Sequence, residues 1–157
     1  MSDNLQSQAP APLQVNGQYI KDLSFEVPNA PHVLAELAGS PPEVSLRVDI
    51  HVEPLHENTY EVVLHLAIEA KAKEKTAFIL ELSYGGAFTV YVPEEHLQPF
   101  LLIECPRLLF PFVRSIVSEV TMNGGFAPMV LPPIDFVTLF RNRMEQLAKE
   151  QSQAGSA

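Results

Sequence analysis

Residues 44–52 read VSLRVDIHV, and an apolar side chain occupies every second position of this stretch. Alternation with a period of two is typical of a β-strand that buries one face and exposes the other. The apolar set is Val44, Leu46, Val48, Ile50 and Val52, and the polar set is Ser45, Arg47, Asp49, His51 and Glu53. The stretch therefore predicts a sheet with one face in the core and one face in water.

Three other segments alternate in the same way. Their apolar faces are Tyr19, Leu23, Phe25 and Val27 in the first, Tyr60, Val62, Leu64, Leu66 and Ile68 in the second, and Phe78, Leu80, Leu82 and Tyr84 in the third. The short polar connections at 54–59 and 71–75 predict hairpins, so the last three strands form an antiparallel meander. The longer connection at 28–42 is expected at the surface. Gly85 and Gly86 are expected to end the sheet, because paired glycines weaken strands.

Two helices are predicted after the sheet. The first opens at Pro93, which is followed by two acids that suit a helix N-terminus, and it stops at Gly124 and Gly125. Pro106 and Pro111 are expected to kink or divide this helix. The second helix is capped by Asp135. Its apolar residues at helical spacing are Phe136, Leu139, Phe140, Met144 and Leu147.

These patterns predict an α+β fold, in which a four-stranded antiparallel sheet carries two main helices on one face. A chain of 157 residues fits one domain, which is expected over residues 14–150. A disordered N-terminal tail at 1–13 and a disordered C-terminal tail at 151–157 are expected on either side.

The net charge of −9 is unevenly distributed, because residues 1–95 hold fourteen acids and five bases while residues 96–157 hold five of each. An acidic surface repels phosphate backbones, which argues against a nucleic-acid partner. It suits a basic protein partner, although solubility alone also explains it. The apolar runs fall short of the roughly 18 residues that a membrane helix needs, so no membrane insertion is expected.

The residues that could carry chemistry are sparse. The five histidines lack metal-ligand spacing on a helix, and Cys105 is the single cysteine and has apolar neighbours that favour the neutral thiol. Phosphate-binding glycine motifs are absent from the sequence. The sequence therefore predicts neither an enzyme nor a cofactor or metal. One cysteine and no secretory signal favour a cytoplasmic location.

Residues 99–140 hold six of the nine phenylalanines and six of the fourteen prolines but only five charged residues. A single sheet covered by two helices cannot easily conceal this many aromatic rings. Each buried phenylalanine is worth roughly 1.5 to 3 kcal/mol, so a few of them lining a groove could bind extended apolar chain. Part of the aromatic surface is therefore expected to contact other subunits or a ligand.

Several longer motifs resemble those of the bacterial SecB export chaperones. They are KDLSFEVPNAP at 21–31, YEVVL at 60–64, TAF at 76–78 before the glycine pair, CPRLLFPF at 105–112 and PIDF at 133–136. The resemblance runs in order over roughly residues 15–147. It implies a cytosolic, ATP-independent chaperone that holds secretory preproteins unfolded and delivers them to the motor protein SecA. It also implies a homotetramer, assembled as a dimer of dimers.

The resemblance further implies three sets of functional residues. The SecA-docking set is Asp22, Glu26, Ile79 and Glu81. The client-groove set is Phe78, Leu80, Leu82, Phe88, Phe126, Phe136 and Phe140. The oligomer-interface set on the first helix is Leu108, Phe112, Val113, Ile116 and Val120.

Two other readings of the apolar surface remain open from the residues themselves. One is a general holdase, or an oligomer that binds apolar ligands, without delivery to SecA; a small-molecule site of this kind would need a closed pocket with convergent polar groups. The other is a purely structural oligomer, which would not affect the aggregation of an unfolded client.

Overall fold

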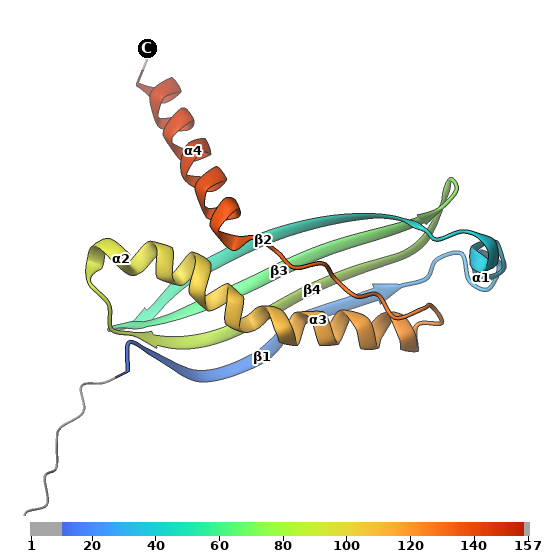
Figure 1. The fold of residues 1–157 in the computed structure, drawn as a ribbon, viewed down its shortest axis with the longest axis horizontal. Coiled ribbons are helices and arrows are strands. Elements are labelled where there is room, and N and C mark those ends of the chain that lie inside the picture. Colours follow the sequence, from blue (N-terminus) through green and yellow to red (C-terminus); the bar gives the residue numbers. More distant parts are fainter. Residues whose placement is uncertain (1–10, 156–157) are drawn as a thin grey trace, which may run out of the picture.

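The structure is a computed structural model that describes residues 11–155. Four strands form one antiparallel sheet in the order β1-β4-β3-β2 (Figure 1). The strands are β1 (Leu13–Glu26), β2 (Glu43–His56), β3 (Thr59–Ala72) and β4 (Lys75–Val90). The helical segments are α1 (His32–Glu36), η1 (Leu37–Gly39), α2 (Glu94–Pro99), η2 (Phe100–Glu104), α3 (Cys105–Asn123) and α4 (Phe136–Ala154). Within the described residues, no helix is long and apolar enough to cross a membrane.

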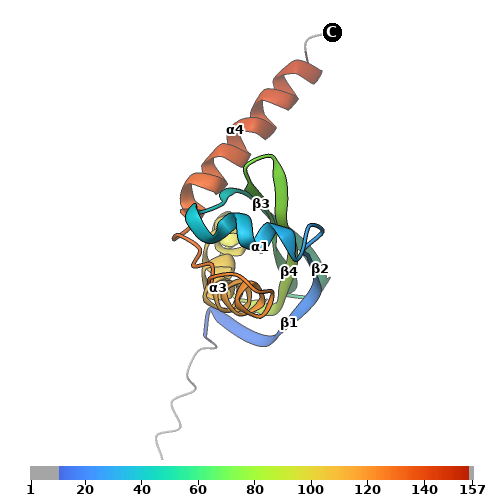
Figure 2. The same cartoon turned by 90° about the vertical axis from the view of Figure 1, so that its right-hand side faces the viewer.

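The core lies between α3 and one face of the sheet, which we call the inner face. Helix α3 runs along this face, and none of the described helices lies on the opposite, outer face of the sheet (Figure 2). Every fourth residue of α3 is buried against the strands, namely Cys105, Leu109, Val113, Val117 and Thr121. A row with this spacing lies along one side of a helix. The predicted alternation of β2, β3 and β4 is confirmed, because the register places their apolar positions together on the inner face.

Strand β4 continues through Gly85 and Gly86 to Val90, so the prediction that this pair ends the sheet is wrong. The glycines instead allow close packing. A Cβ atom on Gly86 would lie 2.7 Å from Cε2 of Phe88 and 3.0 Å from Cδ2 of Leu109. A Cβ atom on Gly85 would lie 2.8 Å from Cε2 of Tyr19, on the outer face. Side chains thus approach the backbone from both faces where the pair stands.

Two bulges in β1 change which face the residues between them, Gly17 to Ile20, present. Tyr19 pairs with Gly85, which puts it on the outer face, whereas Leu23 pairs with Leu82 on the inner face. The register shift between Ile20 and Asp22 inserts one extra residue. An inserted residue reverses the alternation on one side of the bulge. The prediction that Tyr19 shares the apolar face of β1 is therefore wrong.

The first long helix is not divided at its prolines. Segments α2, η2 and α3 follow one another without a break, and the π-helical turn η2 lies directly before Cys105 and Pro106. A wide turn there accommodates a residue that lacks an amide hydrogen. The predicted stop at the glycine pair is confirmed. Gly125 has φ 98°, and Phe126 N donates to Thr121 O at 3.1 Å, as in a Schellman motif.

Helix α4 begins as predicted, because Asp135 Oδ1 accepts a hydrogen bond from Thr138 N at 3.1 Å. It does not lie across the inner face, however. It leaves the sheet near β2 and points away from it (Figures 1 and 2), and Phe136 is its buried residue within the described part of the chain. One long helix, not two, covers the sheet, because α4 contacts the sheet near β2 and then extends away from it.

The ends of the domain also differ from the expected tails. Helix α4 extends to Ala154, since residues 148–154 include good helix formers such as alanine, lysine and glutamine. At the other end, Leu13 already pairs with Val90 in β1. The remainder of the predicted N-terminal tail, residues 1–10, and residues 156–157 lie outside the described part.

Candidate functional surfaces

The outer face brings the four predicted docking residues together. Glu26 pairs with Ile79 across β1 and β4, Ser24 pairs with Glu81, and Asp22 pairs with Ser83. Asp22, Glu26 and Glu81 are exposed, and Ile79 is half-buried among them. The alternation in β4 was sufficient to place Ile79 and Glu81 on this face. The expected roles of the four residues remain a proposal.

The same face continues across β3 and β2, and this continuation depends on the strand register. Ile79 is opposite Glu69, and Glu81 is opposite Ala67, which in turn is opposite Arg47. A shallow depression of about 260 Å³ lies here, lined by Ser45, Leu46, Arg47, Ala67, Ile68, Glu69, Ile79 and Glu81. The sequence pattern missed Glu69 as a neighbour of Ile79, because a period of two does not say which residues pair.

A three-residue cluster lies farther along the outer face. Glu61 of β3 accepts a hydrogen bond from Tyr19 of β1 and forms an ion pair with Lys21, whose Nζ atom lies 2.7 Å from Oε1. These hydrogen bonds lower the pKa of Glu61. Burial and the neighbouring carboxylate raise the pKa of Tyr19 to about 12. The cluster is therefore a neutral phenol, a carboxylate and an ammonium held together across β4.

An apolar cavity of about 480 Å³ lies at one end of the inner face. It is lined by Leu34, Leu37, Ala38, Ser40, Pro41, Pro42, Val44, Phe78, Gly125, Phe126, Ala127 and Met129. The rings of Phe78 and Phe126 are 5.0 Å apart between centroids, and Phe25 lies 5.5 Å from Phe78. Two of the predicted client-groove residues, Phe78 and Phe126, thus meet in one cavity. Gly125 makes the turn that places Phe126 there.

The segment 32–42, predicted to be a surface connection, supplies half of the residues that line this cavity. It folds as α1 and η1, and Val33 is fully buried. The spacing of Val33, Leu34 and Leu37 is helical and could have indicated a packed segment. Five residues are too few for a periodic pattern to stand out.

Five of the predicted client-groove residues are buried, and one of them, Phe78, is 3% exposed and lines the apolar cavity. Leu80, Leu82 and Phe88 have no exposed surface and Phe136 is 2% exposed, so a client cannot reach them in this structure. The prediction is wrong for these four. Leu80, Leu82 and Phe88 occupy inner-face positions of β4 beneath α3, and Phe136 is buried at the start of α4. Phe136 packs against Phe110, with ring centroids 6.1 Å apart.

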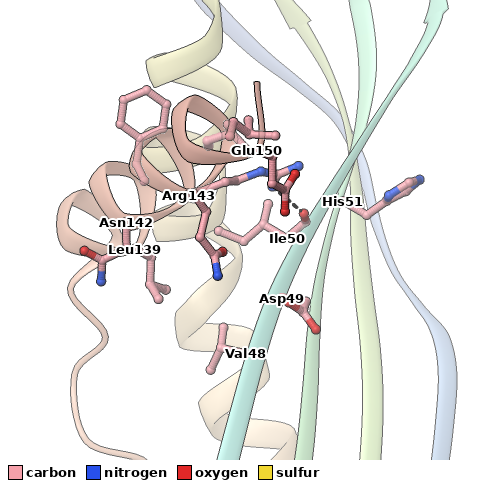
Figure 3. Close-up of a pocket in the computed structure, with 12 residues that line it drawn as sticks. Val48, Asp49, Ile50, His51, Leu139, Asn142, Arg143 and Glu150 are labelled. Carbon is pink, nitrogen blue, oxygen red and sulfur yellow. Dashed lines mark hydrogen bonds between the residues drawn. The ribbon is translucent and has the colours of Figure 1, made fainter. Parts of the chain in front are cut away.

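Phe140, the remaining predicted groove residue, lines a second cavity of about 570 Å³ between β2 and α4. Figure 3 shows Leu139, Asn142 and Arg143 of α4 across from Val48 and Ile50 of β2. Arg143 Nη1 donates to the backbone oxygen of Ile50 at 2.9 Å. This contact joins the edge strand β2 to the helix that leaves the sheet.

The predicted oligomer residues divide between two sides of α3. Val113 is fully buried in the row that packs on the sheet, so its assignment to an interface is wrong. Leu108 and Phe112 are 40% and 49% exposed, and Phe112 stacks on Tyr84 at 6.0 Å. Ile116 and Val120 continue the same side at intervals of four and are half-buried. These residues form an apolar ridge, Leu108, Phe112, Ile116 and Val120.

The apolar ridge continues onto β1. Val15, Ile20 and Leu23 belong to the inner face by register, yet they are 45%, 48% and 37% exposed. Helix α3 packs mainly on β3 and β4, which leaves these positions of the edge strand open. An apolar strip of this kind on a monomer indicates a contact surface.

The structure offers little for chemistry. Among residues 11–155, no three histidine, cysteine or acidic side chains are grouped so that they could hold a metal ion. Cys105 is fully buried, and burial raises the pKa of its thiol to about 12. A thiol in this state is a poor nucleophile.

Known proteins resemble this chain over most of its length. The family model described as "Preprotein translocase subunit SecB" matches residues 6–147. A protein from Paramagnetospirillum magneticum named "Protein-export protein SecB" is 56% identical over 142 residues, covering 90% of this chain and 92% of that protein. A protein of the same name from Rhodospirillum rubrum is 52% identical over 147 residues, covering 94% and 91%.

A solved structure shares the fold. It is a SecB-like chaperone from Mycobacterium tuberculosis in complex with a peptide from the HigA1 antitoxin. The TM-score is 0.66 and the identity is 14%, over 78% of this chain and 91% of that chain. At this identity the likeness concerns the arrangement of the sheet and helices.

Proposed function

The chain belongs to the SecB family, and we propose from this that it is a cytosolic, ATP-independent export chaperone that holds unfolded preproteins and delivers them to SecA. The observation that carries the proposal is the separation of two unlike surfaces. Aromatic and aliphatic residues line a cavity beside the inner face, whereas acids surround Ile79 on the outer face. A protein that must hold one partner while it meets another needs two such surfaces.

The aromatic cavity suits a client that has no defined structure. Its lining is almost wholly apolar, with Phe78 and Phe126 in contact, so it can accept large side chains of varied shape. Such contacts are individually weak. Several of them along one extended chain increase the overall affinity through effective concentration, and the client can still be released. A catalytic role is not part of the proposal.

The outer face suits a structured, basic partner. Glu26, Glu69 and Glu81 surround the half-buried Ile79, and an apolar side chain within a charged rim is a common arrangement for a binding hot spot. Long-range attraction by the acids would speed the encounter, and burial of Ile79 would supply short-range affinity. We assign SecA to this face and retain Asp22, Glu26, Ile79 and Glu81 as its docking residues.

The apolar ridge on α3, together with the open inner-face residues of β1, is our assignment for the contacts between subunits. The assembly we propose is a homotetramer built as a dimer of dimers. It would present several client cavities and several outer faces at once. One long preprotein could then occupy more than one cavity.

Light scattering from a chemically denatured secretory protein tests the holding function. Dilution into buffer that contains the chain but no nucleotide should leave the solution clear, because the chain binds the unfolded client before it aggregates. Undiminished scattering would contradict a holdase of any kind and favour the purely structural oligomer. Suppression of scattering without any affinity for SecA would leave the general holdase.

Delivery is tested by Glu81→Lys, which reverses one charge beside Ile79. We expect the affinity for SecA, measured by calorimetry, to fall by at least about ten-fold, because a charge facing a like charge opposes docking. Suppression of client aggregation should be unchanged, since Glu81 lies on the outer face. The matched control is Glu145→Lys on the exposed side of α4, which should bind SecA normally. Undiminished SecA binding by Glu81→Lys would remove this face as the docking site.

A further inference from the structure

The cluster of Tyr19, Lys21 and Glu61 joins strands that are not neighbours. Glu61 belongs to β3 and the other two residues to β1, with β4 between them. Gly85 of β4 lies beneath the Tyr19 ring, and a Cβ atom there would be 2.8 Å from Cε2. The missing side chain therefore lets the Tyr19 ring lie against the backbone of β4 and reach Glu61. The cluster therefore differs from an ordinary surface ion pair, because its carboxylate is buried and bonded to two side chains.

The bulge in β1 is what brings Lys21 to Glu61. The extra residue lies between Ile20 and Asp22, and the ion pair shows that the Lys21 side chain is on the outer face. Lys21 therefore stands directly before Asp22, one of the proposed docking residues. An unpaired ammonium at this position would offset the charge of Asp22 and repel a basic partner.

Glu61 is placed to prevent this repulsion. It is 8% exposed, and both carboxylate oxygens are occupied, Oε1 by Lys21 and Oε2 by Tyr19. The negative charge of Glu61 is thus balanced within the cluster and contributes little to the potential of the face that a partner would touch. Lys21 is half-exposed, so its charge would act on the surroundings if Glu61 were neutral.

We propose that Glu61 is a counter-ion that neutralises Lys21 and thereby keeps the outer face attractive to the basic surface of SecA, with Tyr19 holding the carboxylate in place. This role rests on the proposed function, because it presupposes that SecA docks on the outer face. Glu61 is a positioning and charge-setting residue in this account. The residues that contact SecA are Asp22, Glu26, Ile79 and Glu81.

A double-mutant cycle separates charge neutralisation from structural support. Glu61→Gln keeps the shape of the side chain and one acceptor oxygen, but it removes the negative charge that balances Lys21. We expect it to weaken SecA binding by about three- to ten-fold at low salt, measured by calorimetry. Lys21→Gln in the same chain should restore the affinity to within about two-fold of the unsubstituted protein, because the added repulsion has gone.

Lys21→Gln alone supplies an independent readout. It leaves the Glu61 carboxylate unbalanced, so SecA should bind at least as tightly as to the unsubstituted chain, and the affinity should fall more steeply with salt. If SecA binds weakly to this single variant, or if the double variant binds as weakly as Glu61→Gln, the cluster is only structural and the proposal is overturned. Unchanged binding by Glu61→Gln also overturns it.

Failure of this proposal can be told apart from failure of the proposed function. If the unsubstituted chain does not bind SecA, or if Glu81→Lys binds as well as the unsubstituted chain, docking on the outer face is overturned and the counter-ion role with it. If Glu81→Lys abolishes binding while Glu61→Gln does not weaken it, only the counter-ion role is overturned. Client holding should be equal in all these variants, because the cluster lies on the face away from the aromatic cavity.

Discussion

Gly86 illustrates how strongly one residue can constrain this sheet. Its position is in the centre of the inner face, where the Phe88 ring and Leu109 of α3 close over the backbone. The space that a Cβ atom would need is already filled by side chains that are fully buried. Neighbours held in a close-packed core have little freedom to move away. Gly17 in β1 is a natural contrast, because no atom of residues 11–155 outside its immediate chain neighbours lies within 4 Å of where its Cβ atom would be.

We expect Gly86→Ala to lower the free energy of unfolding by about 1 to 3 kcal/mol, the usual cost of overpacking a core. Gly17→Ala, the matched control, should change it by less than about 1 kcal/mol, since alanine also reduces the freedom of the unfolded chain. Urea denaturation followed by circular dichroism measures both values. Equal stability of the two variants would show that the contacts over Gly86 relax easily.

Single residues also show where sequence reasoning reaches and where it stops. Ile79 and Glu81 were assigned to the outer face correctly, because β4 alternates without a break between them. Tyr19 was assigned to the wrong face, because the bulge before Asp22 leaves no mark in a pattern of apolar and polar letters. Glu61 was read as an ordinary polar-face residue, although it holds two residues of another strand.

Helix α3 has two apolar sides, one that packs in the core and one that is partly exposed. One row, with Val113 at its centre, is fully buried against the sheet. The apolar ridge that includes Leu108 is turned one residue around the helix and is partly open. The broad stripe seen in the sequence is the sum of the two. Because they interleave at intervals of one and three residues, the sequence alone could not separate the core row from the ridge.

Substitutions on the two sides of α3 should have different effects. Val113→Ala should lower the free energy of unfolding by about 2 kcal/mol, because it leaves a cavity against the sheet, and should not change the mass of the assembly. Leu108→Glu should reduce the mass measured by light scattering, because it puts a charge on the apolar ridge. Its Tm should fall only by the amount that the loss of assembly accounts for. Dissociation by Val113→Ala, with an intact assembly in Leu108→Glu, would contradict this division.

For the helices after the sheet, the sequence predicts where they begin and end but not how they are oriented. The start of α4 followed from Asp135 and the proline pair before it, and the end of α3 followed from Gly124 and Gly125. The direction of α4 could not be predicted from the sequence, because it depends on contacts with β2, whose residues lie far from α4 along the chain. The burial of Leu80 and Phe88 beneath α3 could not be predicted for the same reason, because it also depends on contacts between elements that are distant in sequence. Of the groove residues inferred from sequence, Phe78 and Phe126 meet in one cavity, and their contact with clients stays a prediction, whereas Leu80 and Phe88 are buried beneath the helix.

For the whole molecule, the decisive feature is that the two binding surfaces differ in their physical basis. The aromatic cavity works by removing apolar surface from water, and the outer face works largely by charge. Attraction between exposed charges is screened over about 10 Å at 0.1 M salt and about 3 Å at 1 M. Apolar burial does not depend on screening. The two activities should therefore respond to salt in opposite or unrelated ways.

We expect the affinity for SecA to fall steadily as sodium chloride is raised from about 0.05 M to about 0.5 M, and suppression of client aggregation to persist over the same range. Calorimetry gives the first quantity and light scattering of the denatured client gives the second. The slope for SecA should be shallower in Glu81→Lys, which has lost part of the attraction, and unchanged in Glu145→Lys. A SecA affinity that ignores salt would mean that Ile79 and its apolar surroundings dominate docking. A client affinity that collapses with salt would mean that clients also bind the acidic face, and the assignment of separate surfaces would then be wrong.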